Sequence, residues 1–170
     1  AATGKMVQQG APAFSPPKWC EKYDRAVAIK DFTIGTHRFP QAAGDFKAFR
    51  RGPRVDAATG ELAVRLVDEM GLGKDDVTDV LSVSFSATDY VGHTYGTEGV
   101  EMCIQMAQLD ATLGTLFAEL DRRGIDYVAV LSADHGGVDA PERSQLAGSK
   151  SAQRMDTALT DVALSAAVSK

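Results

Sequence analysis

Two short motifs hold carboxylate and imidazole side chains at spacings that suit metal binding. In the first, Asp89 and His93 are four residues apart, so one turn of helix would place both on the same face. In the second, Asp134 and His135 are adjacent and are followed by two glycines, which let the backbone turn sharply. Carboxylate oxygen and imidazole nitrogen both suit Zn²⁺, and three or four such ligands with an open position make a catalytic site. The four residues therefore predict ligands for one or two metal ions.

The segments around these motifs predict a βαβ unit. Residues 80–85 form a short β-branched run that predicts a strand, and the nearly continuous apolar run 127–133 predicts a strand covered on both faces. Apolar residues recur between them at steps of four and three, which predicts one long helix over 97–123 that ends at Gly124. Each motif begins where a predicted strand ends, and ligands of open α/β sheets bind at that edge. We therefore expect the two motifs to face one site.

The rest of the chain has a weaker pattern. Residues 1–60 are interrupted by prolines and are predicted to be irregular and rich in loops. Helical spacing predicts a helix over 61–70 that stops at Gly71, and a weaker pattern predicts another over 156–168. Residues 61–170 are therefore predicted to hold a partial α/β metal-binding core, a βαβ unit with flanking helices.

The composition narrows the classes of function. The 170 residues include 18 basic and 23 acidic side chains, giving a net charge of -5, with no basic surface to attract DNA, RNA or an anionic membrane. No run approaches the roughly 20 apolar residues of a membrane span, and the first residues lack the pattern of a signal peptide. We expect a small-molecule substrate, no nucleic-acid partner and no membrane partner.

The two cysteines are too few and too far apart to predict a disulfide framework or a cysteine zinc site. We expect Cys103 to pack on a helix as a buried free thiol. Cys20 predicts nothing specific.

Each metal-binding motif has an ordinary interpretation when it is taken alone. Asp-x-x-x-His can be a capping aspartate with a partly buried histidine, and Asp-His-Gly-Gly can be only a turn. Their joint occurrence at both strand ends of one βαβ unit is more specific. The sequence DYVGHTYG at 89–96, a long helix, and VLSADHGG at 130–137 together resemble the alkaline phosphatase superfamily. The chain is most similar to bacterial alkaline phosphatases related to nucleotide pyrophosphatase/phosphodiesterases, most strongly over 77–145.

The resemblance implies a three-layer αβα fold with a mainly parallel sheet, of which this chain supplies a part. It also implies that Asp89 and His93 bind one zinc ion and that Asp134 and His135 bind another. The implied reaction is zinc-dependent hydrolysis of phosphate monoesters through a phospho-enzyme intermediate, with a small phosphorylated substrate. The implied location is periplasmic or secreted.

Three parts of the family's site have no match here: an upstream aspartate, the nucleophile and a downstream histidine. His37 precedes both motifs, and Ser86 and Thr88 lie inside the first motif, where we expect structural roles. We therefore expect an internal fragment of a longer enzyme, catalytically incomplete alone, whose fold the remaining part of the same enzyme completes. Two alternatives stay open: a phosphodiesterase or nucleotide pyrophosphatase of the same superfamily, or a non-catalytic fragment that binds a metal or a partner.

Overall fold

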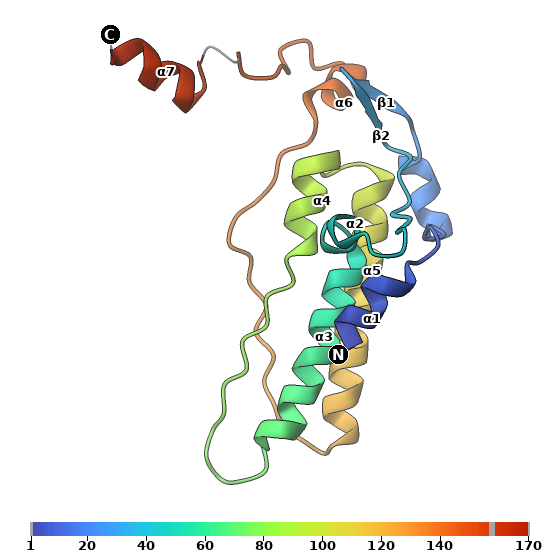
Figure 1. The fold of residues 1–170 in the computed structure, drawn as a ribbon, viewed down its shortest axis with the longest axis vertical. Helices are drawn as coiled ribbons and strands as arrows, with labels where there is room; N and C mark the ends of the chain where they lie inside the picture. Colours follow the sequence, from blue (N-terminus) through green and yellow to red (C-terminus); the bar gives the residue numbers. More distant parts are fainter. Residues whose placement is uncertain (1, 157–158, 170) are drawn as a thin grey trace.

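A computed structural model describes residues 2–156 and 159–169, and its centre is a group of three helices (Figure 1). The long helices α3 (Pro53–Met70) and α5 (Val100–Arg122) lie side by side, and α4 (Ala87–Tyr95) packs against α5. The other elements are α1 (Ala2–Gln9), the 3₁₀ helix η1 (Lys18–Tyr23), β1 (Val27–Ile29), β2 (Phe32–Ile34), α2 (Phe46–Arg50), α6 (Pro141–Leu146) and α7 (Asp161–Val168).

The predicted long helix is confirmed as α5, which ends close to Gly124. The helix predicted over 61–70 also exists as α3, but it begins earlier, at Pro53. Proline suits the first turn of a helix because that turn needs no donor from its backbone nitrogen. Gly71 ends α3 as predicted, in the left-handed conformation with φ of 68°.

Residues 1–60 contain more regular structure than we predicted. The strands β1 and β2 pair in antiparallel register, with Val27 opposite Ile34 and Ile29 opposite Phe32. Three of these side chains pack in a small buried cluster with Ala140. The predicted boundary at residue 60, between the loop-rich segment and the α/β core, stays a prediction, although α3 continues across it.

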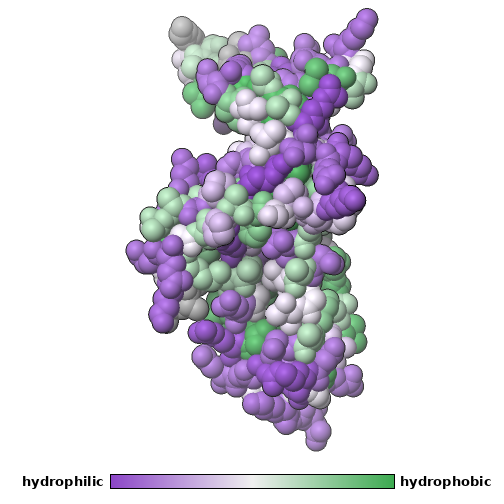
Figure 2. Space-filling model, turned by 90° about the vertical axis from the view of Figure 1, so that its right-hand side faces the viewer, coloured by the Kyte–Doolittle hydropathy of each residue, from purple (hydrophilic) through white to green (hydrophobic). Residues whose placement is uncertain are grey.

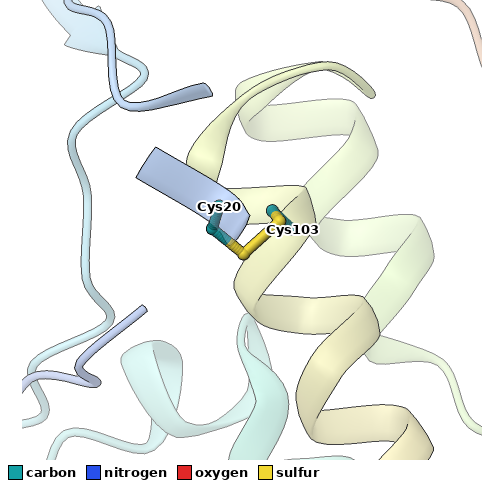
Figure 3. Close-up of a disulfide and its surroundings, with 2 residues drawn as sticks. All are labelled: Cys20 and Cys103. Atoms are coloured by element: carbon teal, nitrogen blue, oxygen red, sulfur yellow. A yellow bond between two sulfur atoms is a disulfide. The ribbon is translucent and has the colours of Figure 1, made fainter. Parts of the chain in front are cut away.

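The two cysteines form a disulfide, so the prediction of a free thiol at Cys103 was wrong. The bond joins η1 to the first turns of α5 (Figure 3), and the two Cα atoms are 5.8 Å apart although 83 residues separate them in sequence. Both residues are buried, in a cluster that includes Val91 and Ile104. Sequence separation misled the prediction because it says nothing about distance in the folded chain.

The two predicted strands are extended but unpaired. Within the described part of the chain, neither 80–85 nor 127–133 is assigned as a strand, and the parallel sheet is not observed; the two-stranded sheet formed there is the β1–β2 hairpin. Both segments run beside the helical group in Figure 1. A strand forms only when a neighbouring strand accepts and donates its backbone hydrogen bonds. The apolar pattern predicted the local shape correctly and could not supply the neighbour.

The upper part of the molecule is joined to the larger body by a narrow waist, which Figure 2 shows together with apolar side chains that reach the surface.

The C-terminal helix predicted over 156–168 is observed as α7, which begins at Asp161; residues 157–158 of that prediction lie outside the described residues. α7 lies away from the helical group (Figure 1). The described helices include none long and apolar enough to span a membrane.

Candidate metal centre

The two metal-binding motifs meet at the carboxylate of Asp89. Helix α4 places His93 one turn after Asp89, with 3.2 Å between His93 Nε2 and Asp89 Oδ1. From the other motif, His135 Nε2 lies 3.4 Å from the same oxygen and 3.6 Å from Asp134 Oδ2. The two imidazole rings are 6.5 Å apart between centroids. The fold therefore brings together all four residues that the sequence singled out.

Backbone groups of the second motif orient the His135 side chain. His135 Nδ1 lies 2.8 Å from the carbonyl oxygen of Gly136, and the backbone nitrogen of His135 donates to Asp134 Oδ1 at 3.0 Å. When Nδ1 carries the proton and donates to Gly136, Nε2 keeps a free lone pair that faces Asp89. The Gly136 carbonyl first, and then the charges of Asp134 and Asp89, raise the pKa of His135. This orientation matches the way in which metal-binding histidines are held.

The four side chains line an open cavity. The Asp89 side chain is 41% exposed and that of Asp134 is 84% exposed. The cavity has a volume of about 1090 Å³, and its other walls include the α5 side chains Met102, Met106, Leu109 and Leu113. The site can therefore be reached from outside the described chain, either by a small molecule or by further polypeptide.

The donor types fit zinc. Two imidazole nitrogens and two carboxylates are the ligands that Zn²⁺ takes, and the Gly136 carbonyl supplies the usual outer contact. Their mutual distances of 3.2, 3.4 and 3.6 Å are those of ion pairs, and the described residues form no group of three or more such ligands that could hold a metal ion. The role of these four residues as ligands stays a prediction.

The end of the second motif is fixed to the loop after α4. The backbone nitrogens of Thr97 and Glu98 donate to Asp139 Oδ1 at 2.9 and 3.1 Å, and Arg143 pairs with the same carboxylate. Asp139 was not predicted from the sequence. Its position could have indicated this role. Asp139 closely follows the Asp-His-Gly-Gly motif, and an aspartate there can accept hydrogen bonds from the backbone of a neighbouring loop.

His37 lies outside the candidate centre, against α4 and α5. Its ring stacks on Tyr95, and its backbone nitrogen donates to the buried carboxylate of Glu101 at 2.8 Å. Burial lowers the pKa of His37, and burial together with the charge of Glu101 raises the pKa of Tyr95 to about 12. These residues therefore pack the end of α4 as neutral rings.

Asp56 and Gln105 were also missed. Both are buried beneath α4, and Gln105 donates to Thr88 Oγ1, which gives Thr88 a structural contact. Asp56 precedes Gly60, Ala63 and Val67 at helical spacing, so it lies on the buried face of α3. A carboxylate on the apolar face of a helix is the signal that could have found this contact.

Comparison with known proteins assigns the chain to a family. The pattern of the type I phosphodiesterase / nucleotide pyrophosphatase family matches residues 3–164. The chain belongs to this family, and the resemblance found in the sequence is confirmed.

Its similarity to individual proteins points to alkaline phosphatases. The chain is 47% identical to alkaline phosphatase PhoK of Sphingomonas sp, over 99% of this chain and 30% of that protein. It is 48% identical to alkaline phosphatase PhoD of Zymomonas mobilis, over 94% of this chain and 28% of that protein. The chain thus spans about 30% of the length of these curated relatives.

A solved structure supports the fold class. The crystal structure of alkaline phosphatase PafA matches 71% of this chain and 25% of its own, with a TM-score of 0.55 and 25% sequence identity. The likeness confirms the α/β class. The parallel sheet is a finer statement and stays a prediction.

Proposed function

We propose that this chain supplies metal ligands to a zinc-dependent phosphatase that hydrolyses phosphate monoesters. The observation that carries the proposal is the convergence of His93 and His135 on one oxygen of Asp89, from segments distant in sequence. The family assignment and the alkaline phosphatases among the relatives support the same reaction class. Both lines of support concern hydrolysis of a phosphoester.

The residues of the candidate centre have roles in binding and orientation. Asp89 and His93 would hold one zinc ion, and Asp134 and His135 the other. The carbonyl of Gly136 keeps His135 Nε2 directed at the centre. When bound, zinc polarises a phosphate oxygen and lowers the pKa of the attacking hydroxyl or water. The proposed phospho-enzyme forms on a nucleophile outside these 170 residues, as the family resemblance implies.

We propose further that these residues are part of a longer enzyme, which completes a parallel sheet over the extended segments. Val128 and Val130 are about 90% exposed here, which is unusual for adjacent parts of one apolar run. The chain also spans only about 30% of its curated relatives. Strands of a buried parallel sheet carry such apolar runs on both faces. The rest of the enzyme would cover them.

The disulfide supports the proposed location. Disulfides form and persist in the periplasm and outside cells, and they are rare in a reducing cytosol. The Cys20–Cys103 bond is therefore consistent with a periplasmic or secreted enzyme.

The test uses the intact protein, with zinc analysis and turnover of p-nitrophenyl phosphate. We expect about two zinc ions per chain, by the proposed ligand count. Asp134→Ala should lower turnover on the order of a hundredfold or more, because metal-ligand loss removes several kcal/mol of transition-state stabilisation. Asp126→Ala, an exposed aspartate earlier in the same extended segment, is the matched control and should leave turnover unchanged.

A phosphodiesterase is the second candidate, because the family description names that activity. It would keep the same four ligands and differ in the pocket for the leaving group. Turnover of bis(p-nitrophenyl) phosphate, measured beside the monoester, separates the two. Faster hydrolysis of the diester would favour the second candidate, and zinc-free protein with no turnover would contradict both.

A further inference from the structure

The helix that carries Asp89 and His93 is not capped by its own sequence. The first backbone N–H groups of any helix have no partner within the helix. Ser86 precedes α4, and its side chain makes no capping hydrogen bond. The backbone nitrogen of Ala87, the first residue of α4, instead donates to Oδ1 of Asp56 on α3 at 3.1 Å. A carboxylate at this end also interacts favourably with the helix dipole.

Gln105 on α5 completes the contact. Its Nε2 donates to Oδ2 of Asp56 at 2.8 Å and lies 3.3 Å from Oγ1 of Thr88, the residue before Asp89. Asp56 is 1% exposed and Gln105 is fully buried. Three helices are therefore joined by one buried polar network at the start of α4.

A buried network of this kind is costly unless its hydrogen bonds are made. Burial raises the pKa of Asp56, while the hydrogen bonds from Ala87 and Gln105 oppose that rise. Well-packed apolar residues would hold three helices together at least as firmly, so stability is a weak explanation for the network. Hydrogen bonds are directional, and two bonds of the network involve the first two residues of α4: Ala87 donates to Asp56, and Gln105 donates to Thr88. They restrict both the rotation of α4 about its axis and its movement along that axis.

We propose that Asp56 and Gln105 are positioning residues for the metal centre, and that they set its zinc affinity by fixing the helix that carries Asp89 and His93. The inference rests on the proposed function. A metal site needs its ligands within about 0.5 Å of the productive geometry, so a small rotation of α4 is enough to weaken binding. The two residues act through the backbone of Ala87 and the side chain of Thr88, and neither forms a hydrogen bond with a proposed ligand.

The test compares Asp56→Ala with Asp56→Asn in the intact protein. Asparagine keeps an oxygen for Ala87. Once the Gln105 amide flips, the asparagine amide can donate to Gln105 Oε1, which has no partner among the described residues. Zinc affinity is measured by competition with a chelator, and the geometry of the centre by the absorption spectrum of the cobalt-substituted protein. We expect Asp56→Ala to weaken zinc binding by about tenfold to a hundredfold, as loss of outer contacts does, and to change the cobalt spectrum. Asp56→Asn should restore both.

A matched control separates positioning from general destabilisation. Gln41 is also buried, and its amide donates to the carbonyls of Met6 and Val7 in α1. Gln41→Ala should lower the melting temperature of the metal-free protein and leave zinc affinity unchanged. If Asp56→Ala does not fold, Gln105→Leu removes the hydrogen bonds to Asp56 and Thr88 while filling the space, and it should also weaken zinc binding.

The outcomes distinguish the two proposals. One outcome is that the wild type binds zinc and that Asp56→Ala or Gln105→Leu has the same zinc affinity and cobalt spectrum. This result would overturn the positioning role and leave the proposed function standing. Loss of affinity in Asp56→Asn equal to that in Asp56→Ala would also overturn it. A wild-type protein that binds no zinc would remove the proposed function, and the positioning role with it.

Discussion

The helical group and the extended segments carry apolar residues of the same kinds but bury them very differently. Val91, Val100 and Ile104 are at most 1% exposed in the helical group, whereas Val128 and Val130 in the second segment are about 90% exposed. A helix satisfies its backbone hydrogen bonds internally and needs only side-chain packing from its neighbours. A strand needs a neighbour for its backbone as well. The helical group therefore buries its apolar side chains within the described chain, and the second segment does not.

The candidate centre lies across this boundary. Asp89 and His93 come from α4, a helix that α3 and α5 hold in place and whose own residues Ala87 and Val91 are fully buried. Asp134 and His135 come from the exposed segment, which is tied to the rest of the chain at Asp139. Contacts within the described chain thus fix one half of the ligand set. The other half lies on the segment for which a covering sheet is proposed.

The largest effect is expected from breaking the disulfide that secures the helical group. Replacing Cys20 and Cys103 together by alanine should lower the free energy of unfolding by about 2–4 kcal/mol, because the bond constrains a long loop of the unfolded chain. Urea unfolding of the intact protein under non-reducing conditions measures this loss. A reducing agent should destabilise the wild type similarly and leave the double variant unaffected. Equal stability of the two proteins without reductant would show that the bond contributes nothing.

A smaller effect tests whether the extended segments are covered in the intact protein. Val130→Thr keeps the β-branched shape but adds a hydroxyl, which costs about 1–3 kcal/mol when it is buried without a partner. At an exposed position the same change stays within about 0.5 kcal/mol. We expect the larger loss in urea unfolding of the intact protein. Val77→Thr, on an exposed turn, is the control and should change little. A loss at Val130 no greater than that at Val77 would contradict a covering sheet.

The smallest effect concerns the pH dependence of the helical group. Burial raises the pKa of Asp56 above its ordinary value of 3.8, so the folded state favours the protonated form. Asp56 therefore stabilises the folded state at pH values below its ordinary pKa. This contribution is lost as the pH rises through the raised pKa of the folded state. Asp56→Asn removes the titration, so its stability relative to wild type should increase over this interval. Urea unfolding of the metal-free wild type and variant at a series of pH values measures this difference in stability. Parallel dependence of the two stabilities on pH would contradict a raised pKa of Asp56.

Local pattern accounts for the parts of the fold that were predicted correctly. The repeat of apolar residues along α5 and the glycine after α3 are signals within one element, and both helices were found. The start of α3 at Pro53 was missed because proline was taken only as an interruption. Residues 80–85 and 127–133 were predicted as strands of a parallel sheet; they are extended, but their pairing is not observed in the described part of the chain and stays a prediction.

The family and the four residues of the candidate centre could be identified from the sequence, because they are defined by residue type and spacing along the chain. The tertiary structure alone decided that Cys20 meets Cys103 and that Asp56 caps a helix 31 residues away. It also decided that two motifs converge on a single oxygen of Asp89. Helical periodicity arises from contacts three and four residues apart, so it can be read locally. Contacts between helices depend on how whole elements pack, which no short stretch of sequence records.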